Sequence, residues 1–535
     1  MGALLLLIVA WAVFSGNNGQ RDTNCREKEI LLKKRINDRY GYLHFSVLRT
    51  VLNTMNQHSN AAQSPESETP KCYSDFVRKL DQKQGGKTIS SFQIDEKAVD
   101  SLVKQFLPVY KIYLENSSSM DGYVSGETQF EKSIFSLISN VAIGKGYKNI
   151  ELYFVSERVK KIEGIDPGSD EFEENLARFF SGLDQKIFKE AGRGYTNLSD
   201  IVGHVFNEQK KDENTISILV SDFIFAPRTK KPSEDFINAQ SEKLKMTFAK
   251  EIEKSNIATL VLRLESEFNG VYYPANYHAD KKTRQLEKKR RPFYLWIMGK
   301  PTSLYGLKTA INKMTDKNKE VPVYKLFLYG KVQDEIRYRI LPYTDAAGRF
   351  RIDRDIGRER DGETVYYGIK DVEADKGTNR IAFSMAVDLS SFSYLDSRYI
   401  ADAANYDVSS QDYRIESVHA IDRSQLETVV DRRDRKLLQK GTYTHKIVIS
   451  SVTDYVSEEV LDIALKRRAG LPKWVARFSS ENDNSISNYD REELRKTWKI
   501  QNIVGAVFEA YQAKSWNHQR QQPKPFFSLS ISIRR

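Results

Sequence analysis

The sequence contains little cysteine and histidine. Its 535 residues include two cysteines, Cys25 and Cys72, and seven histidines. Neither cysteine lies in a CxxC pair, and the histidines form no HExxH or other spaced ligand set, so zinc and thioredoxin-like chemistry have no support. After export the two cysteines could form one disulfide, and two free thiols are the equal alternative.

Long apolar runs are missing after the first residues, so we expect no transmembrane helix in the body of the chain. The run from Ala3 to Phe14 is too short to span a bilayer comfortably, but it suits the h-region of a signal peptide. We therefore expect an exported protein, either periplasmic, at the cell surface or anchored by its N-terminus. No Lys or Arg precedes the run, and a misassigned start would make the protein cytoplasmic.

The excess of positive charge is mild. The chain has 83 Lys and Arg against 72 Asp and Glu, which gives a net charge of +11. The ordinary interpretation is a solvated surface, although this balance also suits a polyanion or a membrane surface as partner. Hydrophobic residues at 40% exclude disorder for most of the chain, and the length favours several domains.

Apolar strands alternate with amphipathic helices from Ala98 onward. This alternation is typical of an α/β fold with an open, doubly wound, mainly parallel sheet of Rossmann-like type, whose ligand-binding loops share the rim at the carboxyl ends of the strands. We expect strands at 109–114, 150–155, 217–221, 258–264 and 293–298. We expect helices at 129–141, 170–190, 198–206, 236–253 and 303–314.

Beyond Val321 the pattern changes to short alternating runs at 323–329, 380–387 and 443–452, which are typical of a β-sandwich or other antiparallel module. An amphipathic helix at 491–513 and an edge strand at 525–533 should follow. The predicted domains are a leader at 1–16, a helical segment with a linker at 17–97, the α/β domain at 98–318, the β-rich domain at 319–470, and a C-terminal helix and tail at 471–535.

Oxygen-bearing side chains follow the first expected strand at Glu115, Ser117 and Ser119. A loop leaving a strand can converge such oxygens on one hard cation. Thr196 precedes an expected helix, and Asp222 follows an expected strand. Together the three loops resemble those of the von Willebrand factor A (VWA) family, whose metal-ion-dependent adhesion site (MIDAS) uses an Asp-x-Ser-x-Ser motif, a Thr from a second loop and an Asp from a third. The resemblance spans residues 105–315.

This resemblance implies a divalent cation, Mg²⁺ or alternatively Ca²⁺ or Mn²⁺, and a protein partner that completes the metal shell with a carboxylate. The implied ligands are Glu115, Ser117, Ser119, Thr196 and Asp222. Glu115 stands where the family has Asp, so its longer side chain must fold back or bind through water, and Mg²⁺ tolerates geometric error poorly. Asp222 is followed by Phe223, where the family often has Gly. The alternative is a degenerate site without a cofactor, in which the hydroxyls only cap helices and hold loops.

A basic stretch separates two expected core strands, within residues 265–291. Basic residues among tyrosines can bind an anionic partner, whereas the simpler interpretation is a solvated hairpin or an extra helix at the sheet edge. The candidate residues are Lys281, Lys282, Arg284, Lys288, Lys289, Arg290 and Arg291.

Signatures of enzymes are missing, because the sequence has no P-loop spacing, no GxSxG and no nucleophile placed beside a general base. We therefore expect a non-enzymatic binding or scaffolding protein that uses the metal site. The first alternative is a structural subunit of a larger assembly with a degenerate site, which binds through residues 281–291 and the C-terminal module. The second is a metal-dependent phosphate-ester hydrolase. Nucleic acid is not an expected partner.

Overall fold

The structure is a computed structural model that describes residues 107–535 with internal gaps. The gaps are 145–146, 193–196, 213, 225–232, 276–282, 317–321, 332–335, 361–362, 423–425, 440–442, 453–457, 469, 485 and 518–521. Several expectations therefore lie outside the described residues, namely the leader, the helical segment and linker at 17–97, both cysteines, Thr196, Lys281 and Lys282. Among the described residues, no helix is long and apolar enough to cross a membrane.

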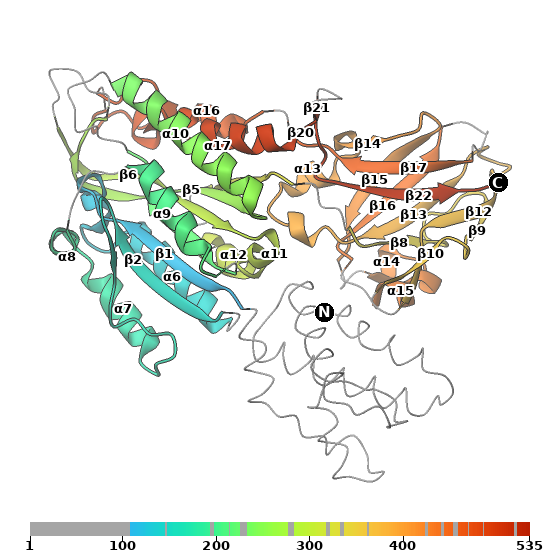
Figure 1. Cartoon of the computed structure of the whole chain (residues 1–535), viewed down its shortest axis with the longest axis horizontal. Helices are drawn as coiled ribbons and strands as arrows, with labels where there is room; N and C mark the ends of the chain where they lie inside the picture. The colour runs from blue at the N-terminus through green and yellow to red at the C-terminus, as the bar shows by residue number, and fades with distance from the viewer. Residues whose placement is uncertain are drawn as a thin grey trace, which may run out of the picture. The chain divides into compact units, whose positions relative to one another are not determined.

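The described chain divides into two compact units. One, the α/β unit, contains Leu107–Lys331 and Arg468–Pro523, and the other, the β unit, contains Val332–Arg467 and Lys524–Arg535. The expected C-terminal helix and tail thus belong to different units. Figure 1 shows the elements of both units.

A mixed sheet forms the centre of the α/β unit. Its strands, among the described residues, run in the order β3-β2-β1-β4-β6-β5-β7. Only the β2-β1-β4 part is parallel, since β3, β6, β5 and β7 join antiparallel to their neighbours. The strands are β1 (Val109–Glu115), β2 (Asn149–Val155), β3 (Val159–Lys161), β4 (Ile216–Ser221), β5 (Ala258–Tyr272), β6 (Arg284–Gly299) and β7 (Tyr324–Tyr329).

Helices cover both faces of this sheet. Phe293 of β6 packs against Phe130 of α6, with ring centroids 5.1 Å apart, whereas Trp296 packs against Phe248 of α10 at 6.0 Å. Side chains three positions apart on a strand point to opposite faces, so α6 and α10 lie on opposite sides. The helices are α6 (Gln129–Ile143), α7 (Phe172–Gly182), α8 (Gln185–Glu190), α9 (Leu198–Gln209), α10 (Ser233–Lys254), α11 (Pro301–Gly306), α12 (Lys308–Asp316), α16 (Lys473–Arg477) and α17 (Ile500–Ser515).

The mixed α/β class is as expected, but the sheet is not mainly parallel as predicted, because two of its described pairings are parallel and four are antiparallel. Four elements also differ from the predictions, and one of them, the expected helix 303–314, is the two helices α11 and α12. The expected connection 265–291 continues both flanking strands, so β5 and β6 form one long antiparallel hairpin. The run 323–329 is β7, which pairs with β5 in the mixed sheet rather than in the β-rich module. The expected helix 170–190 is two helices, because Asp184 caps a new one by accepting a hydrogen bond from the Ile187 amide.

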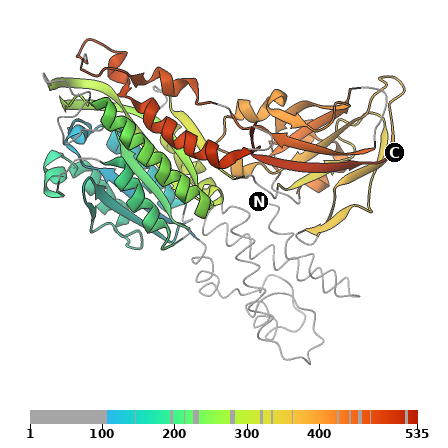
Figure 2. The ribbon, with the colours of Figure 1, turned by 45° about the horizontal axis from the view of Figure 1, so that its top comes forward.

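The C-terminal helix begins later than its periodicity predicts. Residues 491–499 are not part of it, and α17 starts at Ile500 after Lys499, whose φ is +50°. The backbone before it instead forms a short strand, β19 (Thr497–Trp498), that pairs with β18 (Ser479–Ser480). In Figure 2, α17 lies beside α10, and Lys514 donates a hydrogen bond to Glu253 at 2.9 Å.

In the β unit, two sheets pack face to face. Phe350 of β9 contacts Phe383 of β13 at 6.1 Å, and Tyr338 of β8 donates a hydrogen bond to the Ser530 carbonyl of β22. Strand β22, expected at an edge, is central, because it pairs with both β17 and β12. The first sheet has the order β14 (Tyr406–Val408), β17 (Glu459–Leu465), β22 (Phe527–Ile533), β12 (Gly368–Glu373), β9 (Arg349–Ile352). The second has the order β15 (Tyr413–Ala420), β16 (His445–Ser451), β13 (Ala382–Val387), β8 (Tyr338–Leu341). Strands β10 (Gly357–Arg360) and β11 (Glu363–Tyr366) form a separate antiparallel pair.

Candidate metal-binding site

The candidate site begins with two neighbouring parallel strands. Strands β1 and β4 pair in register, with Leu114 opposite Val220, so the loops after Glu115 and Ser221 leave the sheet side by side. Strand β1 lies between β2 and β4 in the sheet. The chain passes from β1 through α6 to β2 on one side and later returns to β4 on the other, so the strand order reverses between β1 and β4. Ligands of open α/β sheets bind at such points, at the carboxyl ends of the strands.

Hydroxyl groups connect the loop after β1 with the loop after β4. The Ser117 and Ser119 side-chain oxygens lie 3.0 Å apart, and Ser119 donates a hydrogen bond to Asp222 Oδ1 at 3.2 Å. The structure thus brings three of the five expected ligands together. Thr196 lies outside the described residues, so its place is not part of this geometry.

Glu115 turns toward the neighbouring strand. Its side chain is fully buried, and its Oε2 accepts a hydrogen bond from Ser221. This contact follows from the register, because Glu115 and Ser221 are the next residues after the paired Leu114 and Val220. Ser221 was not among the predicted site residues, although its place directly before Asp222 at a strand end was a usable signal.

Asp222 is the most perturbed group of the site. Its side chain is 1% exposed, Oδ1 accepts a hydrogen bond from the Ile224 amide at 3.0 Å, and Oδ2 has no hydrogen-bond partner among the described residues. Burial, and then the negative charge of Glu115, raise the pKa of the Asp222 carboxyl. Two buried carboxylates with an open acceptor oxygen are a chemical environment that a divalent cation would stabilise.

Asn116 fastens the first loop to the segment that leads toward Thr196. Its side-chain amide donates to the carbonyls of Phe188, at 3.1 Å, and Gly192, at 3.2 Å. Ser156 donates to the same Gly192 carbonyl at 3.3 Å. Asn116 was within the predicted loop but was assigned no role, because a side-chain amide that holds backbone leaves no pattern in the sequence.

No protein-family model, curated protein or solved structure matches the chain. Among the described residues, no cluster of three or more His, Cys, Asp or Glu side chains could hold a metal. The candidate ligand set is therefore mixed, with two carboxylates and two serine hydroxyls. Oxygen donors of this kind suit hard cations such as Mg²⁺ and Ca²⁺ rather than zinc or copper.

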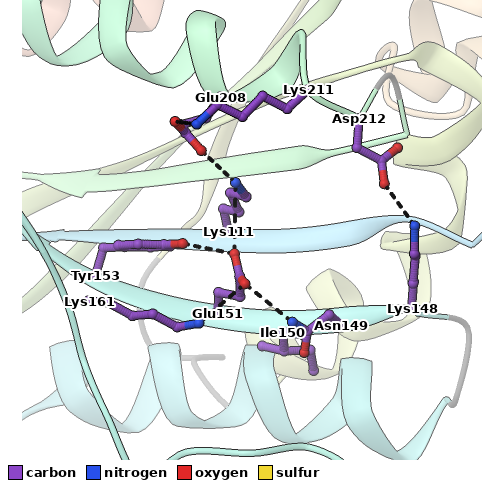
Figure 3. A network of polar contacts seen from close by, with 10 residues as sticks. All are labelled: Lys111, Lys148, Asn149, Ile150, Glu151, Tyr153, Lys161, Glu208, Lys211 and Asp212. Atoms are coloured by element: carbon purple, nitrogen blue, oxygen red, sulfur yellow. Dashed lines mark hydrogen bonds and ion pairs between the residues drawn. The ribbon is translucent and has the colours of Figure 1, made fainter.

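A second polar cluster joins β1, β2 and α9 (Figure 3). Lys111 of β1 forms ion pairs with Glu208 of α9 at 2.9 Å and Glu151 of β2 at 3.8 Å, and Tyr153 donates to Glu151 at 2.8 Å. Lys161 also pairs with Glu151 at 3.3 Å and Lys211 with Glu208 at 2.6 Å, so each carboxylate is paired with lysines, and we interpret the cluster as a structural link between α9 and the sheet. His204 of α9 is half-buried and meets Tyr113 edge to face at 6.3 Å.

The predicted basic residues divide into two groups. Arg284, Lys288, Lys289 and Arg290 lie on β6 with partly or fully exposed side chains. Arg291 is buried instead, at 1% exposure, and donates to the carbonyls of Leu494 and Lys496 at 2.9 and 3.1 Å. It is therefore a structural residue here rather than part of an exposed anion-binding surface, because both bonds attach the C-terminal segment to β6.

Proposed function

We propose that the α/β unit is a VWA-like binding module that captures a protein partner through a divalent cation. Glu115, Ser117, Ser119, Thr196 and Asp222 would hold Mg²⁺, Ca²⁺ or Mn²⁺, and a carboxylate of the partner would complete the shell. The observation that carries the proposal is the contact of Ser119 with Asp222, which joins two loops beside an unpartnered, buried Asp222 oxygen.

The donor set favours binding over catalysis. The cation would supply attraction for an anionic group and would offset the charges of Glu115 and Asp222. Hydroxyl donors add no charge, so they leave the cation electrophilic toward an external carboxylate. A metal-dependent hydrolase would also require a group that activates water, and none of the described contacts assigns that role to a side chain of the site.

The bond from Ser221 to Glu115 determines how the first carboxylate would take part. With its Oε2 accepting from Ser221, Glu115 would face a cation through its other oxygen or through a water molecule. This arrangement predicts a preference for the larger Ca²⁺ or Mn²⁺ over Mg²⁺, since larger cations accept irregular oxygen shells more readily.

The test is calorimetric titration of Mg²⁺, Mn²⁺ and Ca²⁺ into the full chain. Asp222→Asn and Ser119→Ala should abolish or strongly weaken saturable binding. Two matched controls should bind as the wild type does, namely Asp434→Asn, which alters another buried carboxyl, and Ser199→Ala, which alters another buried hydroxyl. Circular dichroism of each variant checks that it is folded. Absence of heat and of thermal stabilisation by any of the three cations would overturn the proposal and favour a structural subunit with a degenerate site.

A further inference from the structure

Helix α15 (Arg432–Gln439) of the β unit begins with charges of both signs, because the Asp431 carboxylate before it accepts a hydrogen bond from the Arg433 amide at 2.8 Å, and Asp434 lies in its first turn. Arg432 and Arg433 occupy its first turn, where the positive end of the helix dipole disfavours cations. Arg432 and Lys436 are also four residues apart, and like charges at that spacing repel. The stability of the helix therefore does not explain why Arg432 and Lys436 are both basic.

The inner side of the helix is firmly held. Leu438 packs in a buried cluster with Leu341 and Ala386. The carboxylate of Asp434 is fully buried and accepts hydrogen bonds from the Tyr343 amide at 2.9 Å and from the Thr344 hydroxyl at 2.7 Å. The apolar and acidic residues of α15 therefore face the protein, and its orientation is fixed.

The outer side presents cations and one aromatic ring. Arg432 and Lys436 are exposed and form no ion pair with any described residue. Arg433 pairs with Asp431 at 3.0 Å, and its guanidinium lies 3.7 Å from the ring centroid of Tyr343, whose side chain is 46% exposed. Figure 1 places α15 at the margin of the β unit, outside its sheets.

We propose that this surface, made of Arg432, Arg433, Lys436 and Tyr343, binds the phosphate groups of an anionic phospholipid bilayer. Lys and Arg side chains are attracted to anionic headgroups, and a partly exposed tyrosine is suited to the interface between water and lipid. Arg433 already covers one face of the Tyr343 ring, which disfavours the base stacking expected of a nucleic-acid surface. Because Leu438 is used in the core, the association is electrostatic and does not require insertion of the helix.

The experiment is co-sedimentation of the full chain with vesicles of phosphatidylcholine, with and without phosphatidylglycerol. Arg432→Gln combined with Lys436→Gln should weaken binding to the anionic vesicles by about fivefold for each cation removed. The matched control is Arg354→Gln combined with Lys376→Gln, because these are also an exposed Arg and Lys of the β unit and cause the same change in net charge. The control should bind as the wild type does, and added salt should release the wild type.

Two results would overturn the proposal. One is equal loss of binding in the two double variants, which would indicate a response to net charge alone. The other is absence of wild-type binding to anionic vesicles. Binding of heparin or an oligonucleotide through the same residues, without binding to the vesicles, would also count as this result. Metal binding at the α/β unit should be unchanged in both double variants, so this test is independent of the proposed cation site.

Discussion

The ring of Phe223 lies 4.7 Å from the ring of Trp296, although the backbone of Phe223 has the left-handed φ of +55°. A bulky residue rarely adopts this conformation, because its Cβ approaches the following carbonyl. The conformation directs the Phe223 amide to Ser221 Oγ at 2.8 Å, and the Ile224 amide to Asp222 Oδ1. Phe223 thus keeps a backbone conformation suited to glycine, and aromatic packing with Trp296 holds it there.

This strain predicts an unusual order of stability for two variants. Phe223→Ala and Phe223→Gly both lose the packing with Trp296, but glycine also removes the conformational cost, so the Gly variant should be the more stable by about 1 kcal/mol. Urea unfolding measures the difference. Phe188 is the control position, because it is a fully buried residue within helix α8. There the Ala variant should instead be more stable than the Gly variant. The same order at both positions would contradict the argument.

A second prediction concerns the buried Arg291. Its loss leaves the Leu494 and Lys496 carbonyls without their donor, and removes the positive charge that faces Asp222 and Asp483. Arg291→Met should therefore lower the free energy of unfolding by about 3 kcal/mol and speed proteolysis of residues 484–499. Arg290→Met, one residue earlier and exposed, should change stability by roughly 0.5 kcal/mol or less. Similar effects of the two substitutions would show that the buried contacts contribute little.

The same contacts explain what the sequence could not reveal. Leu494, Trp498 and Val507 follow a helical rhythm, yet Leu494 lies outside α17 in a short 3-10 helix (Glu493–Arg495). Its carbonyl accepts a hydrogen bond from Arg291, more than two hundred residues away in sequence. Arg263 adds a similar bond to the Arg495 carbonyl at 2.6 Å. Periodicity indicates which residues would lie on the apolar side of a helix. It carries no information about a side chain far away in sequence that donates hydrogen bonds to the carbonyls of the same segment.

Other features could be predicted because they depend on local pattern. Strands β1 and β4 are mostly apolar, as buried parallel strands require, so their ends and the loops carrying Ser117, Ser119 and Asp222 were predictable. The partner of Glu115 was not, because the contact with Ser221 depends on the register between the two strands. Which strand lies beside which is decided by packing of whole layers rather than by the residues of one strand.

The link between α9 and the sheet gives the third prediction. Hydrogen bonds from Lys211, at 2.6 Å, and Lys111, at 2.9 Å, lower the pKa of Glu208 to about 2. A carboxyl whose folded pKa is depressed binds protons less readily than in the unfolded chain, where it titrates near its ordinary pKa of about 4.3. Its contribution to stability is therefore complete above that ordinary value, and is lost as the pH falls toward 2.

Glu208→Gln should accordingly lower the free energy of unfolding at pH 7 by about 1 to 3 kcal/mol, and by roughly half as much at pH 3, where the folded carboxyl is still mostly ionised. The control Glu174→Gln removes an exposed ion pair with Arg178, which lies 2.7 Å away, and should change stability by roughly 0.5 kcal/mol or less at either pH. Urea titrations at the two pH values measure both effects. A loss that is the same at pH 7 and pH 3 would mean that Glu208 stabilises α9 by packing rather than by its charge, because only the charged form receives the full benefit of the two lysines.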